Sequence, residues 1–216
     1  MSAALAEALG RVLPAGLAVG WADPRVRAPV WPGEAIAAVP ARQAEFAAGR
    51  WAARAAMAAL GLRAEVIPMG ADRAPVWPLG VVGSISHSAS ACLAVVGRAE
   101  VWDGIGLDIE PATALAPELW AAVLLADEQA ELGAAAGLQA KRIFTAKEAA
   151  YKAQYAASGA LFGFDGLRIG MGLADFSATF TQAVLPFAAG HCLRGVHFAA
   201  DGHLVSLVVI AAAGEA

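Results

Sequence analysis

Two carboxylates stand two residues apart at the end of an apolar stretch, Gly104-Ile-Gly-Leu-Asp-Ile-Glu110. Because side chains alternate between the faces of a strand, Asp108 and Glu110 share a face that two glycines keep free of bulk. Like charges placed in this way repel each other unless water or a cation lies between them, and oxygen ligands suit Mg²⁺. The pattern predicts a magnesium site, although by itself such a pair is more often a solvated strand end.

A second candidate segment is Phe144-Thr-Ala-Lys-Glu-Ala-Ala-Tyr-Lys152. On a helix Glu148 and Lys152 form an i, i+4 pair, which is also the pattern of an ordinary surface salt bridge. The only lysines of the chain, Lys141, Lys147 and Lys152, all lie in or just before this segment. In a chain that otherwise uses arginine, retained lysines favour a compact charge placed on a phosphate.

A third candidate segment is Gly83-Ser-Ile-Ser-His-Ser88, which follows Arg73-Ala-Pro-Val-Trp-Pro78. The short hydroxyl donors and the histidine are typical of a phosphate or ribose site. The sequence lacks Gly-x-Ser-x-Gly, and His87 is too near Ser86 for a usual nucleophile–base pair. For His87 a structural role and a binding role are equally compatible with the sequence.

The hydrophobic pattern predicts which elements must position these segments. Helices are expected over 41–60, where Arg50 and Arg54 form a cationic ridge, and over 117–135 and 139–157. Strands are expected at 17–22, 92–96, 101–109, 176–181, 197–199 and 204–210. A hairpin is expected at 97–100, a loop at 68–83 and a turn at Asp201-Gly202. Helix followed by strands, twice over, predicts an α+β protein with halves at 1–103 and 104–216, the second carrying the metal site.

Composition narrows the class of protein. The 15 Lys+Arg against 19 Asp+Glu give a net charge of −4, which argues against a general nucleic-acid binder. Cys92 and Cys192 fit no metal spacing and are expected to be small buried residues in a reducing cytoplasm. Glu7 interrupts the apolar start of the chain, so no secretory signal is expected, and no apolar run is long enough for a membrane helix.

Together these segments resemble the 4′-phosphopantetheinyl transferase superfamily, most closely its surfactin-type members and the enterobactin-synthetase component D branch. The resemblance also includes Arg42-Gln-Ala-Glu-Phe-Ala-Ala-Gly-Arg50 with Arg54, and Phe162-Gly-Phe164. The matching blocks run from about residue 34 to 164, roughly two thirds of the chain. Leu107 and Thr145 depart conservatively from the family pattern and leave the carboxylates in place.

The resemblance implies a fold, a site and a role for matching residues only. The implied fold is a pseudo-dimer of two similar α+β halves with the active site in the cleft between them. The implied Mg²⁺ ligands are Asp108, Glu110 and Glu148. Catalysis is assigned to Glu148, as a base acting directly or through a water, and to Lys152. The expected coenzyme A contacts are Arg50, Arg54, Arg73, Ser86, His87, Lys147 and Lys152.

The implied reaction moves the phosphopantetheine arm of coenzyme A to a serine of an apo acyl, peptidyl or aryl carrier protein and releases 3′,5′-ADP. The implied setting is siderophore or secondary-metabolite biosynthesis by a cytoplasmic monomer. Three alternatives stay open. The first is another Mg²⁺-dependent phosphoryl or nucleotidyl transferase, although the sequence contains neither a P-loop nor the kinase signature. The second is a non-catalytic paralogue that binds carrier protein or coenzyme A. The third is a purely structural α+β protein.

Overall fold

The computed structural model describes residues 2–212, which form two compact units, 2–105 with 211–212 and Gly106–Ile210. The division falls within one strand, β4. The elements in chain order are α1 (Ser2–Gly10), β1 (Leu17–Ala22), α2 (Pro40–Ala59), β2 (Val81–His87), β3 (Cys92–Arg98), β4 (Trp102–Pro111), η1 (Pro117–Leu119), α3 (Trp120–Val123), α4 (Ala126–Ala130), α5 (Ala136–Ser158), η2 (Phe164–Gly166), β5 (Leu167–Met171), β6 (Asp175–Phe180), β7 (Cys192–Ala200) and β8 (His203–Ala211).

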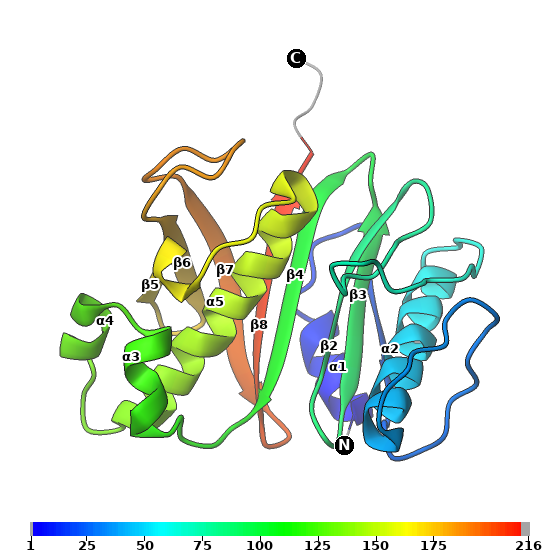
Figure 1. Cartoon of the computed structure of the whole chain (residues 1–216), viewed down its shortest axis with the longest axis horizontal. Coiled ribbons are helices and arrows are strands. Elements are labelled where there is room, and N and C mark those ends of the chain that lie inside the picture. Colours follow the sequence, from blue (N-terminus) through cyan, green and yellow to red (C-terminus); the bar gives the residue numbers. More distant parts are fainter. Residues whose placement is uncertain (1, 213–216) are drawn as a thin grey trace. The chain divides into compact units, whose positions relative to one another are not determined.

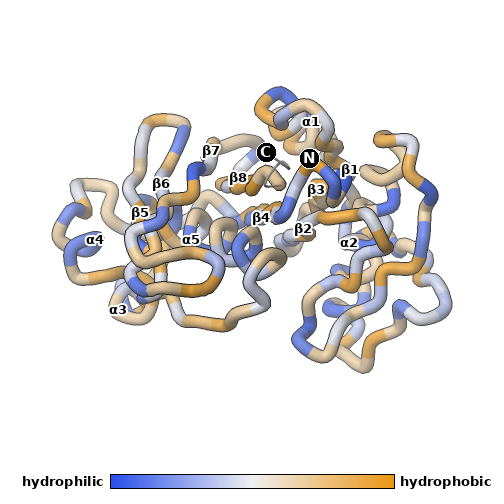
Figure 2. Tube along the Cα trace, turned by 90° about the horizontal axis from the view of Figure 1, so that it is seen from above, coloured by the Kyte–Doolittle hydropathy of each residue, from blue (hydrophilic) through white to orange (hydrophobic). Residues whose placement is uncertain are grey.

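The first unit is built on a three-stranded antiparallel sheet in the order β1-β3-β2 (Figure 1). Six of the seven residues of β3 are buried, because helices cover both faces of the sheet. On β1, Gly20 faces α2 while its neighbour Val19 contacts Gly10 of α1. Seen from above, the sheet lies between α1 and α2 (Figure 2). A strand whose two faces are both covered carries apolar residues along its whole length instead of at every second position.

Helix α2 packs on its sheet at unusually short range. A Cβ on Gly20 would lie 2.0 Å from the carbonyl oxygen of Ala52, so only glycine fits at this point of β1. The helix face that it meets is made of small residues, among them the fully buried Ala48, Ala52 and Ala56. Glycine on the strand and alanine on the helix therefore bring the two backbones into direct contact.

The second unit contains a five-stranded sheet in the order β4-β8-β7-β6-β5, in which β5 to β8 form an antiparallel ladder. Helix α5 crosses this sheet (Figure 1). A Cβ on Gly106 of β4 would lie 1.8 Å from the carbonyl oxygen of Ala149 on α5. The same glycine-on-alanine contact therefore positions the long helix in both units.

Most expected elements are confirmed by the structure. The helices expected over 41–60 and 139–157 appear as α2 and α5, and the strands expected at 17–22 and 204–210 appear as β1 and β8. The turn between β7 and β8 has φ of 48° at Asp201 and 74° at Gly202, as a type I′ turn requires. The α+β class with two similar halves is confirmed. In the described part of the chain no helix is long and apolar enough to cross a membrane.

Several expectations about single elements are wrong. The hairpin at 97–100 does not form, because both edges of β3 are taken by β1 and β2, while β4 pairs with β8. The helix expected over 117–135 is broken at Leu124 and Leu125, whose ψ values of 141° and 159° are extended. The stretch 68–83 is not all loop, since β2 begins at Val81, and α1 and β5 were not foreseen.

Candidate active site

Strand β4 presents the two carboxylates on the face that carries Gly106. Ile105, Leu107 and Ile109 are fully buried in the opposite orientation, which fixes the register of the strand. Asp108 is 4% exposed and Glu110 is half-buried. Because Gly106 brings α5 against this face, the carboxylates lie beside the helix.

Helix α5 supplies a lysine to each of these carboxylates. The Nζ of Lys152 lies 2.6 Å from Oδ1 of Asp108 and donates to the carbonyl oxygen of Leu107 at 3.2 Å. The Nζ of Lys141 donates to Oε2 of Glu110 at 3.0 Å. Both carboxylates of β4 therefore hold an ammonium group from the same helix.

Glu148 is the third carboxylate at this place, and its Oε2 lies 4.0 Å from Nζ of Lys152. Burial raises the pKa of Glu148. The Lys152 ammonium opposes that increase, whereas the charges of Asp108 and Glu110 add to it. The three carboxylates are thus close enough to repel each other, and a cation between them would relieve that repulsion.

The donor set fits a hard divalent cation. Within residues 2–212 no three His, Cys, Asp or Glu side chains are already gathered around one point as a metal cluster. Instead, two of the three carboxylates are occupied by ammonium groups, which are themselves cations. Oxygen-only donors of this kind suit Mg²⁺, which usually takes only one or two protein carboxylates and keeps several waters.

A pocket of about 180 Å³ begins at Glu148. Its lining is largely apolar, with Tyr151 from α5 and Phe162 and Phe164 from the segment that follows the helix, and it also includes Lys147. Tyr151 and Phe162 meet edge to face, with ring centroids 5.2 Å apart. A charged group thus lies at one side of a small apolar chamber, as at a site for a ligand with a polar head and an apolar arm.

Lys147, next to Glu148, is turned into the protein. Its side chain is 1% exposed, and its Nζ lies 2.7 Å from Oε2 of Glu128. It also donates to the carbonyl oxygens of Val123 and Phe164, each at 2.9 Å. Burial lowers the pKa of Lys147, and the bond to Glu128 opposes that decrease. All three ammonium protons therefore serve to join α5 to neighbouring segments.

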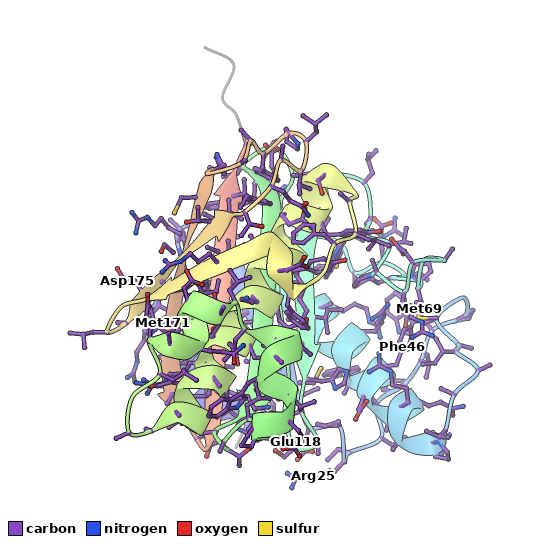
Figure 3. The ribbon with its side chains drawn as sticks, turned by 60° about the vertical axis from the view of Figure 1, so that its left-hand side comes forward. Arg25, Phe46, Met69, Glu118, Met171 and Asp175 are labelled. Atoms are coloured by element: carbon purple, nitrogen blue, oxygen red, sulfur yellow. The ribbon has the colours of Figure 1, made fainter. Side chains whose placement is uncertain are left out.

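In the first unit Arg50 and Arg54 are likewise turned inward. Arg50 donates through Nε to the carbonyl oxygen of Ile67 at 2.9 Å and lies over the ring of Phe46, and burial lowers its pKa to about 10. Arg54 pairs at 2.5 Å with Glu34, which is fully buried. The carbonyl oxygen of Pro68 also accepts a hydrogen bond from Arg50. Figure 3 labels Phe46 on α2 and Met69, the residue that follows Pro68.

His87, at the end of β2, faces α2. Arg42 donates a short hydrogen bond to Nε2 of His87, and Nδ1 lies 3.6 Å from Oε2 of Glu45. Since a guanidinium only donates, Nε2 is the acceptor in this contact. Ser86 is buried on the opposite face of the strand. Arg73 is exposed in a loop and has φ of 69°.

Comparison with known proteins decides the family. Residues 33–97 match the 4′-phosphopantetheinyl transferase N-terminal domain, and residues 104–206 match the 4′-phosphopantetheinyl transferase superfamily domain. The chain is 37% identical to the 4′-phosphopantetheinyl transferase Svp of Streptomyces mobaraensis, over 81% of this chain and 75% of that protein. The chain belongs to the 4′-phosphopantetheinyl transferase superfamily.

Other relatives agree with this assignment to the transferase superfamily. Enterobactin synthase component D of Salmonella typhi is 36% identical, over 77% of this chain and 71% of that protein. The 4′-phosphopantetheinyl transferase PptT of Mycobacterium tuberculosis is 37% identical, over 59% and 58% of the two chains. The family expected from the sequence, including the enterobactin branch among its relatives, is confirmed.

The structure brings together only some of the residues expected to serve a transferase site. Asp108, Glu110, Glu148 and Lys152 gather between β4 and α5. Four of the expected coenzyme A contacts have buried side chains, and their contact with coenzyme A stays a prediction: Lys147, Arg50, Arg54 and Ser86. Of the other expected contacts in the first unit, Arg73 is exposed and His87 is partly exposed.

Several residues that line the pocket or bond to the expected site residues were missed by sequence reasoning. Lys141 was noted only as one of three lysines, although it lies seven residues before Glu148 and hence on the same helix face. Tyr151 could have been found by the same reasoning, since it follows Lys147 by four residues. Glu34 and Glu128 have no such signal, because each finds its cation through tertiary contacts.

Proposed function

We propose that this chain transfers the 4′-phosphopantetheine group of coenzyme A to a serine hydroxyl of an apo carrier protein. The observation that carries the proposal is the cluster of Asp108, Glu110, Glu148 and Lys152, with an aromatic pocket opening beside Glu148. The named activities of Svp and PptT support it. The polar head of the substrate would meet the charged cluster, and the apolar pocket suits the pantetheine arm.

In the proposed reaction the serine oxygen forms a bond to the β-phosphorus of coenzyme A. The bond from that phosphorus to the bridging oxygen breaks, and 3′,5′-ADP leaves with the electron pair. The serine proton passes to Glu148, directly or through a water. The ammonium of Lys152 stabilises the charge that grows on the leaving phosphate.

A Mg²⁺ ion held by Asp108, Glu110 and Glu148 would neutralise pyrophosphate charge that otherwise repels the incoming oxygen. Lys152 already pairs with Asp108 at 2.6 Å, so it is placed to turn from the carboxylate toward a phosphate. In the first unit His87 and Arg73 are proposed for the adenosine 3′-phosphate. Arg42 is added to them because it is half-exposed and already bonded to His87.

The carrier, its pathway and the state of the enzyme in the cell belong to the same proposal. An apo acyl, peptidyl or aryl carrier protein is expected as partner, and enterobactin synthase component D as a relative favours siderophore assembly. A monomer in the cytoplasm remains the expected form. A non-catalytic paralogue is the competing hypothesis, and the presence of all four cluster residues speaks against it.

The test is intact-protein mass spectrometry of a panel of apo carrier proteins incubated with this protein, coenzyme A and Mg²⁺. The expected result is the addition of one phosphopantetheine to at least one carrier, and no addition when EDTA is present. Coenzyme A binding with no transfer to any carrier would favour the non-catalytic paralogue. Absence of both transfer and coenzyme A binding would overturn the proposed function.

A further inference from the structure

The proposed mechanism uses neither Lys141 nor Lys147, and of these two it is Lys141 that pairs with a proposed cation ligand. Its side chain is 13% exposed, and its Nζ lies 3.0 Å from Oε2 of Glu110, whose side chain is 27% exposed. The pair is therefore partly shielded from water, where a charge interaction is stronger than at the open surface. The position of Lys141 next to a proposed cation ligand calls for a function.

One face of α5 carries the charges of the site. Lys141, Glu148 and Lys152 follow each other at spacings of seven and four residues, which places them on a single stripe. The partners on β4 follow in the opposite order along the chain, since Lys141 pairs with Glu110 and Lys152 pairs with Asp108. Glu148 thus stands between two lysines, each of which neutralises one carboxylate of the strand.

We propose that Lys141 is a resident counter-ion of Glu110 that competes with the divalent cation and so sets the affinity of the site for it. This inference rests on the proposed function. A cation bound to Glu110 and the ammonium of Lys141 compete for the same carboxylate and repel each other, so cation binding favours opening of the ion pair. The ammonium of Lys141 has an alternative partner, because its Nζ lies 5.3 Å from the ring centroid of Phe144, within cation–π range.

The roles of the two lysines then differ. Lys152 leaves Asp108 to act on the substrate, whereas Lys141 leaves Glu110 only to admit the cation. In the cation-free protein the ammonium of Lys141 offsets the charge of Glu110, a carboxylate close enough to Glu148 to repel it. Lys141 is accordingly a positioning residue, and its effect should appear in cation binding itself as well as in turnover.

The experiment is a Mn²⁺ titration followed by electron paramagnetic resonance, with Mn²⁺ as the probe for the Mg²⁺ site and without coenzyme A. Lys141→Met is expected to tighten Mn²⁺ binding about three- to tenfold, because the competing ammonium is gone. Lys141→Arg keeps the charge and should bind Mn²⁺ like the wild type. Lys141→Gln supplies the same test if Lys141→Met does not fold, as judged by circular dichroism.

Two controls separate the possible failures. Arg168→Met removes one positive charge from the same unit, where Arg168 pairs with Asp127 and Glu131, and should leave Mn²⁺ affinity unchanged. Asp108→Ala marks the site and should abolish the binding. If the wild type binds no Mn²⁺ that Asp108→Ala removes, the cation site of the proposed function fails together with this inference. If it does bind, but Lys141→Met is unchanged or weaker, only the counter-ion role is overturned.

Discussion

The two units position a long helix by the same device and use it differently. Gly20 meets the backbone of Ala52 in the first unit, and Gly106 meets that of Ala149 in the second. Two residues before each alanine both helices carry a buried cation, Arg50 or Lys147. Each of these cations donates to two backbone carbonyls of neighbouring segments. A glycine contact and an inward cation therefore make up the shared scaffold.

The difference lies in the side chains around that scaffold. The residues two and four positions after the glycine are Ala22 and Pro24 in the first unit but Asp108 and Glu110 in the second. One position before the contact alanine stands Trp51 in α2, where α5 has Glu148. The fold therefore accommodates either set of side chains, and the proposed chemistry depends on a few residues that only the second unit carries at these positions.

The largest expected effect is on activity in the second unit. Asp108→Ala should lower carrier modification by roughly 10²–10³-fold, because the cation and Lys152 both lose their partner. Asp127→Ala, which removes an exposed carboxylate of the same unit, should leave the rate unchanged. The measurement is the rate of phosphopantetheine transfer by mass spectrometry, with circular dichroism to verify the fold. Normal turnover with normal Mg²⁺ dependence in Asp108→Ala would contradict the proposal that Asp108 of the second unit serves the reaction.

The glycine contacts should be equally critical in both units. Gly20→Ala and Gly106→Ala each place a methyl group about 2 Å from a helix carbonyl, and each should lower the free energy of unfolding by about 3 kcal/mol or more. Gly10→Ala and Gly133→Ala are the matched controls, since their nearest neighbours lie at 3.8 and 3.6 Å. Urea denaturation measures all four variants. A mild effect at either contact glycine would show that the two helices are held by different means.

The inward cations come next in expected effect. Lys147→Met leaves the buried carboxylate of Glu128 uncompensated and should destabilise the protein by about 3 kcal/mol. Arg50→Met leaves two carbonyls without a donor and should cost about 1–3 kcal/mol. Both are measured by urea denaturation alongside coenzyme A affinity. A variant that loses coenzyme A binding while its stability stays at the wild-type value would restore the phosphate role expected from the sequence.

The smallest expected effect is a difference in the reactivity of the two cysteines. Cys92 lies in the first unit and Cys192 in the second, so each cysteine reports on one unit. Burial raises the pKa of the Cys92 thiol to about 12, from an ordinary value of 9.0. The folded state thus favours the protonated thiol, and the stability linked to this group is present below pH 9 and is lost as the pH rises toward 12.

Cys92 is buried as expected, whereas the expectation of a buried Cys192 is wrong, because its side chain is exposed at the start of β7. At pH 8, alkylation should therefore modify Cys192 of the native protein and leave Cys92 untouched. During a urea titration followed by mass spectrometry, labelling of Cys92 reports when the first unit opens. If Cys92 reacts before the global unfolding transition, the two units unfold separately. Rapid native labelling of Cys92 would contradict its burial.

Local patterns accounted for much of the candidate site. The alternation of β4 put Asp108 and Glu110 on one face, and the helical period put Glu148 and Lys152 together, because both periods are properties of the backbone. The alternation was not applied to Ser86 and His87, which lie on opposite faces of β2. The serine-rich stretch had not been recognised as a strand.

The α+β class, the long helices, the carboxylate strand and the family could be predicted from the sequence, since these rest on short-range periods and motifs. Which cations face inward could not be predicted, because it depends on tertiary packing. Arg54 meets Glu34 across 20 residues of sequence, and the ammonium of Lys147 reaches carbonyls 24 residues before it and 17 residues after it. A lysine or arginine codes for charge but not for its partner. That partner is selected when buried polar groups must satisfy one another, and this happens only once distant segments have packed.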